Sequence, residues 1–586
     1  MEEAPTSEFD LKGLAVAKGI AHGEAFVMLN LDLKIPVYEI KPADKAGERE
    51  RLQNAIMKAR EDILKVKEEL SERVGEAEAA IFDAHLLALE DVAILKETFD
   101  MLERENFNVE YCYNCAIEKF IGAFEKIDDS FIRERISDLK DVSRRVIDNL
   151  LGRCSSLRIG ALSDPLVLVS SDFSPSDFAL VDKSKILAII TEKGSQTSHT
   201  AILSRSLGIP CIVGVENVAD KISTGMFVLV DGYNGNIIVN PTENTMRHYT
   251  ELESVHREAQ KLFDSAIPLP SETLDGAKFD VSINISGAAD MPSDMENYAG
   301  VGLFRTENFF LDFGSFPDEE TQYKVYADVV RSAKGKPVVI RTLDLGGDKN
   351  LSLMKMVSKE ENPFMGYRAI RFCLDHKETF KTQLRAILRA SALGVVKILL
   401  PMICSIREVE RARLIIEEAK EELSAEGAAF DRDVKIGSMI EVPSAAVTID
   451  IIAKACDFIS IGTNDLIQYM LAVDRVNDMV AHLYEPTHPA VIRILNHVVG
   501  AAREANIPVC VCGELAADPT FCSLLLGMGV TEFSMSATSV GEIKYLLRKI
   551  TLQQAKKLRD EVLSLTRSRH VISRLRSFHY EIMQSQ

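Results

Sequence analysis

Three hydrophobic patterns follow one another along the first half of the chain. Residues 10–35 alternate apolar and polar positions with glycines between them, which predicts strands. In residues 42–151 the apolar positions recur every three or four residues and no proline follows the first one, which predicts a helical bundle. Residues 160–241 return to short apolar runs separated by turn residues. We therefore expect one α/β domain, formed by residues 1–41 and 152–241, into which the helical block 42–151 is inserted.

The second half of the chain has a different rhythm. Residues 242–266 are polar, have a helical pattern and are bounded by prolines, so that we assign residues 242–269 to a linker helix. In residues 270–586, eight apolar runs alternate with helical stretches, which is typical of a (β/α)8 barrel. The runs lie near Val281–Ser286, Val301–Arg305, Val338–Asp344, Lys397–Met402, Ile436–Glu441, Phe458–Gly462, Val509–Gly513 and Glu532–Met535. A doubly wound open sheet is the alternative that this pattern leaves open.

Composition narrows the possible partners and the compartment. The chain has 586 residues, too many for a single small binding module. Acidic residues outnumber basic ones 88 to 68, so no nucleic-acid partner is expected, because phosphate backbones need concentrated Lys and Arg. No apolar run reaches the ~18 residues of a membrane span, and the N-terminus lacks the apolar core of a secretory signal. The ten cysteines have no disulfide-type spacing. We expect a cytoplasmic protein that does not insert into membranes.

Charged and polar side chains follow the predicted barrel strands at the ends where catalysis occurs in such barrels. They are Arg305, Arg341, Lys349, Arg368, Glu441, Asn464, Asp465 and Arg475. Guanidinium groups bind phosphate and carboxylate through two parallel contacts, which indicates a small phosphorylated carboxylic acid as the ligand. Glu441 and Asp465 carry the hard oxygen ligands that suit Mg²⁺. The alternative interpretation is a structural network in which these charges pair across the rim.

Two further residues point to a reaction at such an anion. Cys510 and Cys512 share one face of a strand by alternation, but only Cys512 ends the strand beside the predicted anion site, where a thiol could exchange a proton. A cysteine that merely packs in the core is the alternative. His199 lies in the first turn of a predicted helix, where free N–H groups and the helix dipole favour a phosphate carried on its imidazole. In isolation, a histidine at a helix start is more often a solvated surface residue.

Several motifs together resemble one enzyme family. The segment GSQTSHTAILSRSL, followed by GIPCIVG, resembles the phosphohistidine signature shared by enzyme I of the bacterial phosphotransferase system, pyruvate phosphate dikinase and phosphoenolpyruvate synthase. The barrel motifs resemble enzyme I in particular, and so does the order of the domains. They are GLFRTE, IRTLDLGGDK, EENPFMGYRAIR, SMIEVPSAA, ISIGTNDLIQY, AVDRVN and CGELAAD. The resemblance covers nearly the whole chain.

The resemblance implies a phosphoryl relay. Phosphoenolpyruvate (PEP) is expected to bind the barrel with Mg²⁺, and its phosphoryl group to pass to His199 and then to a histidine of the carrier protein HPr. PEP would be held by Arg305, Arg341, Asn464 and Arg475, with Arg368 supporting the phosphate. Mg²⁺ would be held by Glu441 and Asp465, and Cys512 would protonate the pyruvate enolate. In the family the barrel domain dimerises and the helical insertion docks HPr. Because His199 and the PEP site lie in different domains, we also expect a large swing about the linker helix.

The chain departs from the family pattern at a few positions. Ser195 follows Gly194 where the signature has a second Gly, Asn308 replaces an apolar residue, Phe313 replaces an Arg, and Tyr367 stands where Trp is common. None of these changes removes a residue with a chemical role. The rate of transfer and the preference for a carrier protein are the properties that they would alter. Two other functions stay open: a dikinase- or synthase-like enzyme that uses ATP, and a non-catalytic regulatory protein of the same fold.

The acidity of the chain is concentrated in the helical insertion. Residues 68–110 hold 13 acidic and 3 basic residues, a net charge of −10, which is half of the −20 of the whole chain. A solvated helix face is the simplest explanation. An acidic bundle would also attract a basic carrier protein by electrostatic steering that salt weakens.

Overall fold

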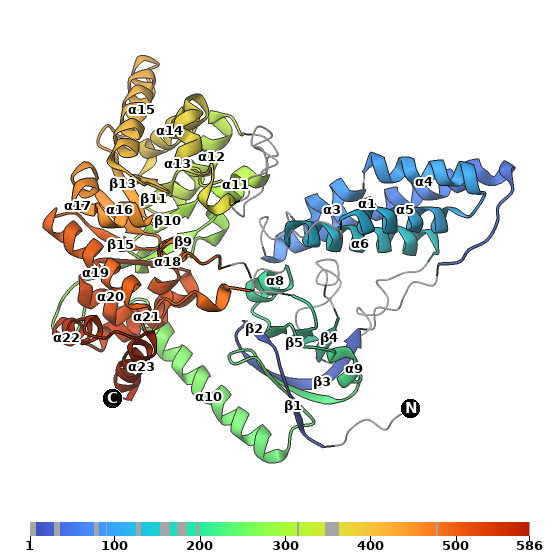
Figure 1. The fold of residues 1–586 in the computed structure, drawn as a ribbon, viewed down its shortest axis with the longest axis horizontal. Coiled ribbons are helices and arrows are strands. Elements are labelled where there is room, and N and C mark those ends of the chain that lie inside the picture. Colours follow the sequence, from blue (N-terminus) through green and yellow to red (C-terminus); the bar gives the residue numbers. More distant parts are fainter. Residues whose placement is uncertain are drawn as a thin grey trace. The chain divides into compact units, whose positions relative to one another are not determined.

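The structure is a computed structural model of the chain, and it forms two compact units, residues 1–256 and 257–586 (Figure 1). The residues that it describes are 7–28, 35–74, 81–89, 91–124, 130–152, 165–171, 173, 185–194, 199–312, 316–345, 362–475, 477 and 479–584.

The first unit contains an eight-stranded mixed sheet with the order β1-β8-β7-β3-β4-β5-β6-β2. Its strands are β1 (Phe9–Lys12), β2 (Leu14–Ala17), β3 (Ile20–Met28), β4 (Leu166–Ser170), β5 (Ile186–Thr191), β6 (Cys211–Val213), β7 (Phe227–Asp231) and β8 (Asn236–Val239). β3 pairs in parallel with β4, with Ala25 opposite Val167. Strands from before and after the helical block therefore join one sheet, whereas the exact domain boundaries stay a prediction.

Between β3 and β4 the chain forms a helical bundle. Its helices are α1 (Lys45–Val74), α3 (Ile81–Leu89), α4 (Val92–Glu105), α5 (Val109–Phe124) and α6 (Ser130–Leu150). Leu52, Ile63 and Leu102 are fully buried in its core, as the three- and four-residue spacing predicts. α4 begins where the Asp91 carboxylate accepts hydrogen bonds from the N–H groups of Ala93 and Ile94, which caps the helix.

Part of the acidic stretch is already paired inside this bundle. The buried Glu110 carboxylate forms an ion pair with Arg51. Glu103 lies 3.1 Å from Arg49, and Glu97 lies 2.8 Å from Lys119. These carboxylates stabilise the bundle, so that the charge free to attract a partner is smaller than the sequence count of the stretch.

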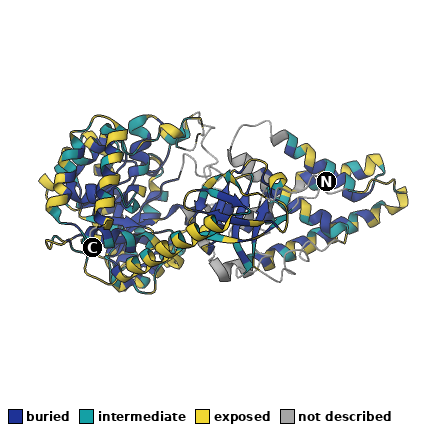
Figure 2. Cartoon of the chain, turned by 90° about the horizontal axis from the view of Figure 1, so that it is seen from below, coloured by how far each residue is buried: buried dark blue, intermediate teal, exposed yellow. Residues whose placement is uncertain are grey.

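The second unit holds a closed barrel of eight parallel strands in consecutive order, which confirms the (β/α)8 prediction and excludes the open sheet. The strands are β9 (Asp280–Ile285), β10 (Val301–Arg305), β11 (Val338–Arg341), β12 (Val396–Leu400), β13 (Lys435–Ile440), β14 (Phe458–Ile461), β15 (Val509–Val511) and β16 (Glu532–Met535). Figure 2 shows that these strands are buried and that the surrounding helices turn exposed faces outward. A separate apolar cluster, which includes Leu303, Met439 and Phe458, is formed by side chains from several of these strands.

The helices around the barrel are amphipathic. In α15 (Ile406–Ala425) the buried residues Val409, Ala412, Ile416, Ala419 and Leu423 follow helical spacing. The other α-helices of the unit are α11 (Glu307–Asp312), α12 (Glu319–Ser332), α13 (Ile370–Asp375), α14 (Lys377–Ala390), α16 (Pro443–Val447), α17 (Ile449–Ile452), α18 (Thr463–Leu471), α19 (Pro489–Glu504), α20 (Cys522–Met528), α21 (Ala537–Arg548), α22 (Leu552–Leu563) and α23 (Ser568–Gln584).

Three more helices complete the described chain. α8 (His199–Leu207) and α9 (Val218–Lys221) belong to the first unit, and α10 (Glu243–Ala266) is the predicted linker helix. No helix in the described part of the chain combines the length and the apolar character needed to cross a bilayer.

Candidate active site

A cavity of about 200 Å³ lies at the carboxyl ends of the barrel strands. It brings together eight of the nine barrel residues that the sequence predicts: Arg305, Arg341, Arg368, Glu441, Asn464, Asp465, Arg475 and Cys512. The ninth, Lys349, lies outside the described residues, as do Ser195 and Phe313. Strand ends that are far apart in sequence therefore meet in one place, because the closed barrel aligns them.

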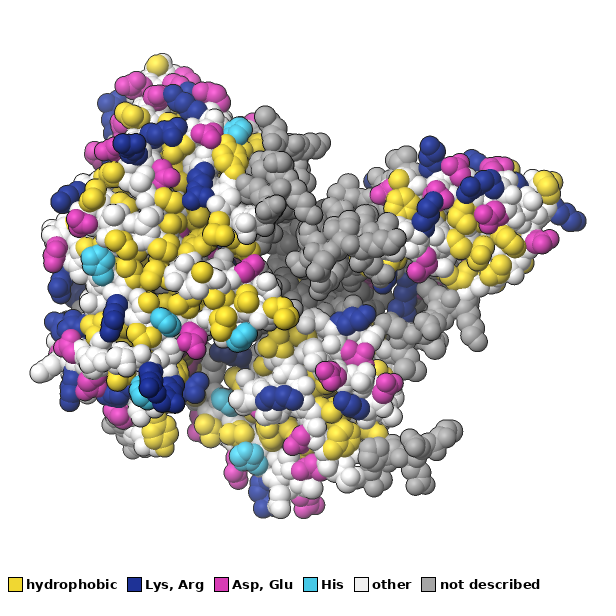
Figure 3. Space-filling view, viewed as in Figure 1, with side chains coloured by type: hydrophobic (Ala, Val, Ile, Leu, Met, Phe, Trp, Pro, Cys, Tyr) yellow, Lys and Arg dark blue, Asp and Glu magenta, His cyan; other side chains and the backbone are white. Residues whose placement is uncertain are grey.

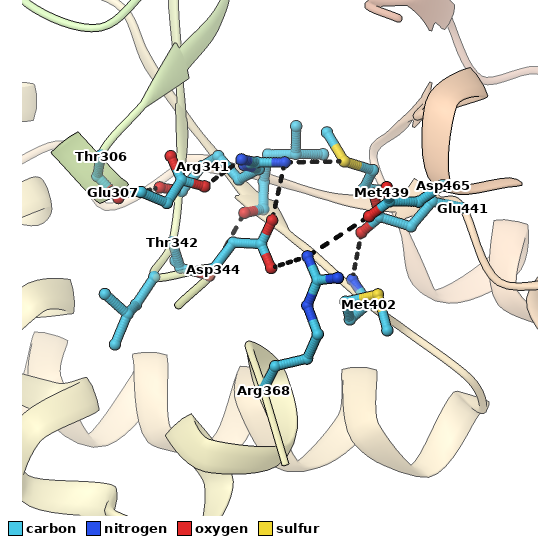
Figure 4. A network of polar contacts seen from close by, with 12 residues as sticks. Thr306, Glu307, Arg341, Thr342, Asp344, Arg368, Met402, Met439, Glu441 and Asp465 are labelled. Atoms are coloured by element: carbon cyan, nitrogen blue, oxygen red, sulfur yellow. Dashed lines mark hydrogen bonds and ion pairs between the residues drawn. The ribbon is translucent and has the colours of Figure 1, made fainter. Parts of the chain in front are cut away.

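Buried ion pairs connect the walls of the cavity (Figure 4). Arg341 contacts Glu307 and lies 3.1 Å from Asp344. Arg368 lies 2.8 Å from the same Asp344 and 3.4 Å from Asp465. Burial disfavours the charge on both guanidinium groups, but the neighbouring carboxylates prevail and raise the pKa of each above its ordinary value. Asp344 thus fixes two arginines at once.

These ion pairs weaken the inference of an anionic ligand from the clustered arginines. Mutual repulsion of the arginines does not by itself require an anion, because the lining also includes the carboxylates of Glu307, Asp344, Glu441 and Asp465. The charges do form a structural network, as the alternative interpretation proposes. The case for an anionic ligand must rest on what this network leaves unsatisfied.

Several donors at the cavity have no partner among the described residues. Nε of Arg341, Nε of Arg368 and Nη1 of Arg475 are buried and make no hydrogen bond there. The exposed guanidinium of Arg305, at the end of β10, has no ion-pair partner in the described chain. Buried donors are rarely left unpaired in a folded protein, so these groups are suited to a ligand with several acceptor oxygens.

Glu441 stands out among the acidic groups. It is 2 % exposed, and its Oε1 accepts a hydrogen bond of 2.6 Å from the N–H of Met402. Burial, followed by repulsion from Asp465 and Asp344, raises the pKa of this carboxyl. A Cβ at Gly462 would lie 2.8 Å from Oε2 of Glu441, so a larger residue at this position would displace the carboxylate. Mutual repulsion among three buried carboxylates indicates a place for a cation.

Cys510 lies in β15 and Cys512 directly follows this strand, and the two side chains differ in their relation to the cavity. Both side chains belong to the apolar cluster defined above, which agrees with the predicted alternation. Only Cys512 lines the cavity. Burial raises the pKa of the Cys512 thiol, so that the thiol holds its proton at neutral pH. A protonated thiol at the cavity wall can serve as a proton donor.

Asn464 and Arg475 come from the segment after β14. Nδ2 of Asn464 donates to Glu514 (2.9 Å), and the N–H of Glu514 donates back to Oδ1 of Asn464 (3.0 Å). Arg475 lies 3.5 Å from Asp465. Both side chains are thereby held at the cavity.

His199 is the first residue of α8, as predicted for a helix start, and its side chain lies outside the described residues. The turn before it contains Gly194 with φ +129°, which favours glycine. Oγ1 of the neighbouring Thr200 donates to the carbonyl of Phe173 (2.8 Å), which anchors the start of α8. His199 belongs to the first unit and the cavity to the second.

The chain matches known proteins over nearly its whole length. Family models of PEP-utilising enzymes match residues 12–135 (N-terminal), 162–235 (mobile domain) and 261–552 (PEP-binding domain). The phosphoenolpyruvate-protein phosphotransferase of Geobacillus stearothermophilus is 40% identical over 97% of this chain and 97% of its own length. That of Bacillus subtilis (strain 168) is 38% identical over 96% and 98%, respectively. The chain belongs to the PEP-utilising enzyme family. The resemblance that the motifs indicate is thereby confirmed.

Membership in the PEP-utilising enzyme family connects the two predicted sites. His199 lies within the segment that matches the mobile domain, and the cavity lies within the PEP-binding domain. The full-length relatives are protein phosphotransferases, which favours enzyme I over an enzyme of the dikinase type.

Sequence reasoning overlooked several residues of the site. Glu307 and Asp344 lie two and three residues after strands β10 and β11, at the predicted strand ends, but no role was predicted for them. Ser460 is polar within the apolar run FISI, and its hydroxyl lies 3.1 Å from Sγ of Cys512. Tyr469, one helical turn after Asp465, accepts a hydrogen bond from Arg368 (3.3 Å). The contacts of Ser460 and Tyr469 could not be inferred from strand ends.

Proposed function

We propose that the protein transfers the phosphoryl group of PEP through His199 to a histidine of an HPr-type carrier protein and releases pyruvate. The observation that supports this most is the set of buried, unpartnered arginine N–H groups around a cavity that also contains a protonated thiol. PEP has a phosphate, a carboxylate and a carbon that must gain a proton. We further propose that the reaction takes place in the cytoplasm, since all nine described cysteines are free thiols.

The arrangement of side chains supports the steps of this reaction. Arg305, Arg341 and Arg475 bind PEP, and Arg368 supports its phosphate. Ion pairs preset the geometry of Arg341, Arg368 and Arg475. The His199 imidazole attacks the phosphorus in line with the leaving enolate oxygen. The thiol of Cys512 then donates its proton to the methylene carbon, which completes pyruvate.

A divalent cation fits the acidic side of the cavity. Glu441 and Asp465 would hold Mg²⁺, with water and substrate oxygens as the remaining ligands. When bound, Mg²⁺ supplies charge that stabilises the phosphate oxygens during transfer. Its two positive charges would also offset the repulsion among the buried carboxylates, leaving the arginines available for the anion.

An exposed apolar surface supports a homodimer through the barrel unit. Met365, Val447, Ile451, Met479 and Leu483 are between 48% and 81% exposed. Figure 3 shows hydrophobic side chains gathered on the face that carries α16, α18 and α19. A large exposed apolar patch is typical of a protein–protein interface.

The test is incubation of the full chain with PEP labelled in its phosphate, with and without Mg²⁺. We expect an acid-labile, alkali-stable label on the protein that needs Mg²⁺ and that His199→Ala abolishes. Glu441→Gln should reduce the labelling rate at limiting Mg²⁺ more than at saturating Mg²⁺, whereas exposed Glu410→Gln is the matched control. Label that persists in His199→Ala contradicts the proposal.

Acceptors then distinguish the remaining functions. Purified HPr should remove the label with no nucleotide present. Removal that needs AMP would favour a dikinase or synthase type of enzyme. A protein that binds PEP but never acquires label would be a regulatory homologue.

A further inference from the structure

The Cys512 thiol is held from two sides inside the barrel. Its Sγ accepts a hydrogen bond from the hydroxyl of Ser460 at 3.1 Å and lies 3.6 Å from the carbonyl oxygen of Ile461. Nδ2 of Asn284 donates to the Cys512 backbone carbonyl at 3.0 Å. Ser460 and Cys512 are 0 % and 2 % exposed, so this geometry is shielded from water by protein.

Ser460 is a buried polar residue in a barrel strand, as are Ser282, Ser438 and Ser534. It stands in β14 between apolar residues, and Cys510 is its neighbour across the ladder in β15. A hydroxyl costs free energy in such a position unless it is hydrogen-bonded, so the partner of each buried serine is informative. Its hydroxyl also interacts with the Cys510 thiol, but it donates at 3.1 Å to Cys512, the thiol that lines the cavity within the described chain.

We infer that Ser460 is a positioning residue for proton transfer by Cys512, a role that rests on the proposed function. When the enolate of pyruvate is protonated, the S–H bond of Cys512 breaks, the proton forms the new bond to the methylene carbon, and the electron pair stays on sulfur. The Ser460 O–H donates to this thiolate more strongly than to the thiol, because hydrogen bonds to charged acceptors are the stronger ones. Water that enters after pyruvate leaves returns the proton to sulfur.

The reverse half-reaction isolates this step. The full chain is labelled on His199 with PEP and Mg²⁺, freed of small molecules, and mixed with Mg²⁺ and pyruvate whose methyl group carries either hydrogen or deuterium. Loss of label to PEP requires the Cys512 thiolate to remove a methyl proton. We expect Ser460→Ala to slow this loss ~10-fold to ~100-fold and to increase the isotope effect, because C–H cleavage becomes rate-limiting. Ser460→Cys, with a weaker donor of similar size, should give an intermediate isotope effect.

The barrel offers a matched control. Ser438 of β13 lies beside Cys456, with Oγ and Sγ 3.1 Å apart, and both residues are buried. Neither lines the cavity within the described chain. Ser438→Ala removes the same kind of contact and should keep the wild-type isotope effect, even if it lowers the melting temperature.

The outcomes separate this inference from the proposed function. If Cys512→Ala abolishes pyruvate-dependent loss of label while Ser460→Ala and Ser460→Cys keep the wild-type rate and isotope effect, the role of Ser460 is wrong and that of Cys512 stands. If Cys512→Ala still transfers label to pyruvate, both assignments are wrong. If Ser460→Ala does not fold, an unchanged isotope effect in Ser460→Cys alone overturns the role of Ser460.

Discussion

What a charged residue in the barrel unit contributes to stability and geometry depends more on its partners and burial than on its residue type. Asp344 contacts both Arg341 and Arg368 deep in the cavity wall. Removing one member of a buried ion pair leaves an uncompensated charge, whereas an exposed pair such as Arg331 with Asp328 contributes little. An arginine–aspartate pair therefore fixes the geometry of the cavity where it is buried, and has little effect on stability where it is exposed.

Glu532 makes the stability of the barrel depend on pH. Burial raises the pKa of this carboxyl, although the Ser282 hydroxyl, which donates to Oε1 at 2.5 Å, opposes the shift. Between the unfolded pKa of about 4.3 and the higher folded one, the native state binds more protons than the unfolded state. The free energy of unfolding contributed by Glu532 is therefore present below the unfolded pKa and is lost as pH rises through the folded pKa.

Glu532→Gln tests this assignment, since the amide oxygen can still accept from Ser282. We expect the variant to gain stability relative to the wild type as pH rises from about 4 to 7, measured as urea midpoints by circular dichroism. Exposed Glu410→Gln serves as the control substitution. A difference between Glu532→Gln and the wild type that does not vary with pH contradicts the assignment.

At the scale of elements, α14 holds the ends of two strands. Oε1 of Gln383 accepts from the Leu343 N–H just beyond β11 (2.9 Å), and its Nε2 lies 3.4 Å from the Thr306 hydroxyl after β10. The Thr306 hydroxyl in turn donates to the Arg341 carbonyl (2.9 Å). This buried network positions the backbone on both sides of Arg341.

Gln383→Leu should loosen this part of the site. It leaves the Leu343 N–H buried without its acceptor, at a cost of about 1–3 kcal/mol in unfolding free energy, and we expect the KM for PEP to rise because Arg341 is less well oriented. Thr382→Ala, on the exposed side of the same helix, is the control and should change neither quantity appreciably. An unchanged KM in a destabilised Gln383→Leu protein would show that the network supports only the fold.

The strands and helices were largely predictable, because the pattern of apolar and polar positions in the sequence matches the burial that the sheet and the barrel produce. Each of the eight predicted apolar runs in residues 270–586 overlaps a barrel strand. Contacts such as Gln383 with Leu343 were not predictable, since nothing local in α14 specifies which strand end it meets. The sequence leaves open that the charges pair across the rim, but the specific pairing of arginines with Glu307 and Asp344 was not predictable, because the closure of the barrel decides which strand ends meet.

At the scale of the whole molecule, α10 is attached to each unit at a different end. Near its start, the Glu8 carboxylate accepts hydrogen bonds from the Thr242 N–H and from Thr245 Oγ1, and His256 stacks on Tyr233 with ring centroids 4.1 Å apart. Toward its end, Phe263 packs against Tyr545 with centroids 5.4 Å apart. Residues 257–262 lie between these attachments and are mostly exposed. A change of orientation between the units would have to occur between these two attachments.

The proposed relay requires such a change, because His199 must reach PEP in the barrel and, later, the carrier. We expect solution scattering of the full chain to give a different pair-distance distribution after addition of PEP and Mg²⁺. Arg341→Met, which lacks a guanidinium for PEP, is the control and should give the same distribution with and without the ligands. Identical distributions for the wild type in both conditions would contradict a swing about α10, and transfer would then have to occur with the two units in a single arrangement.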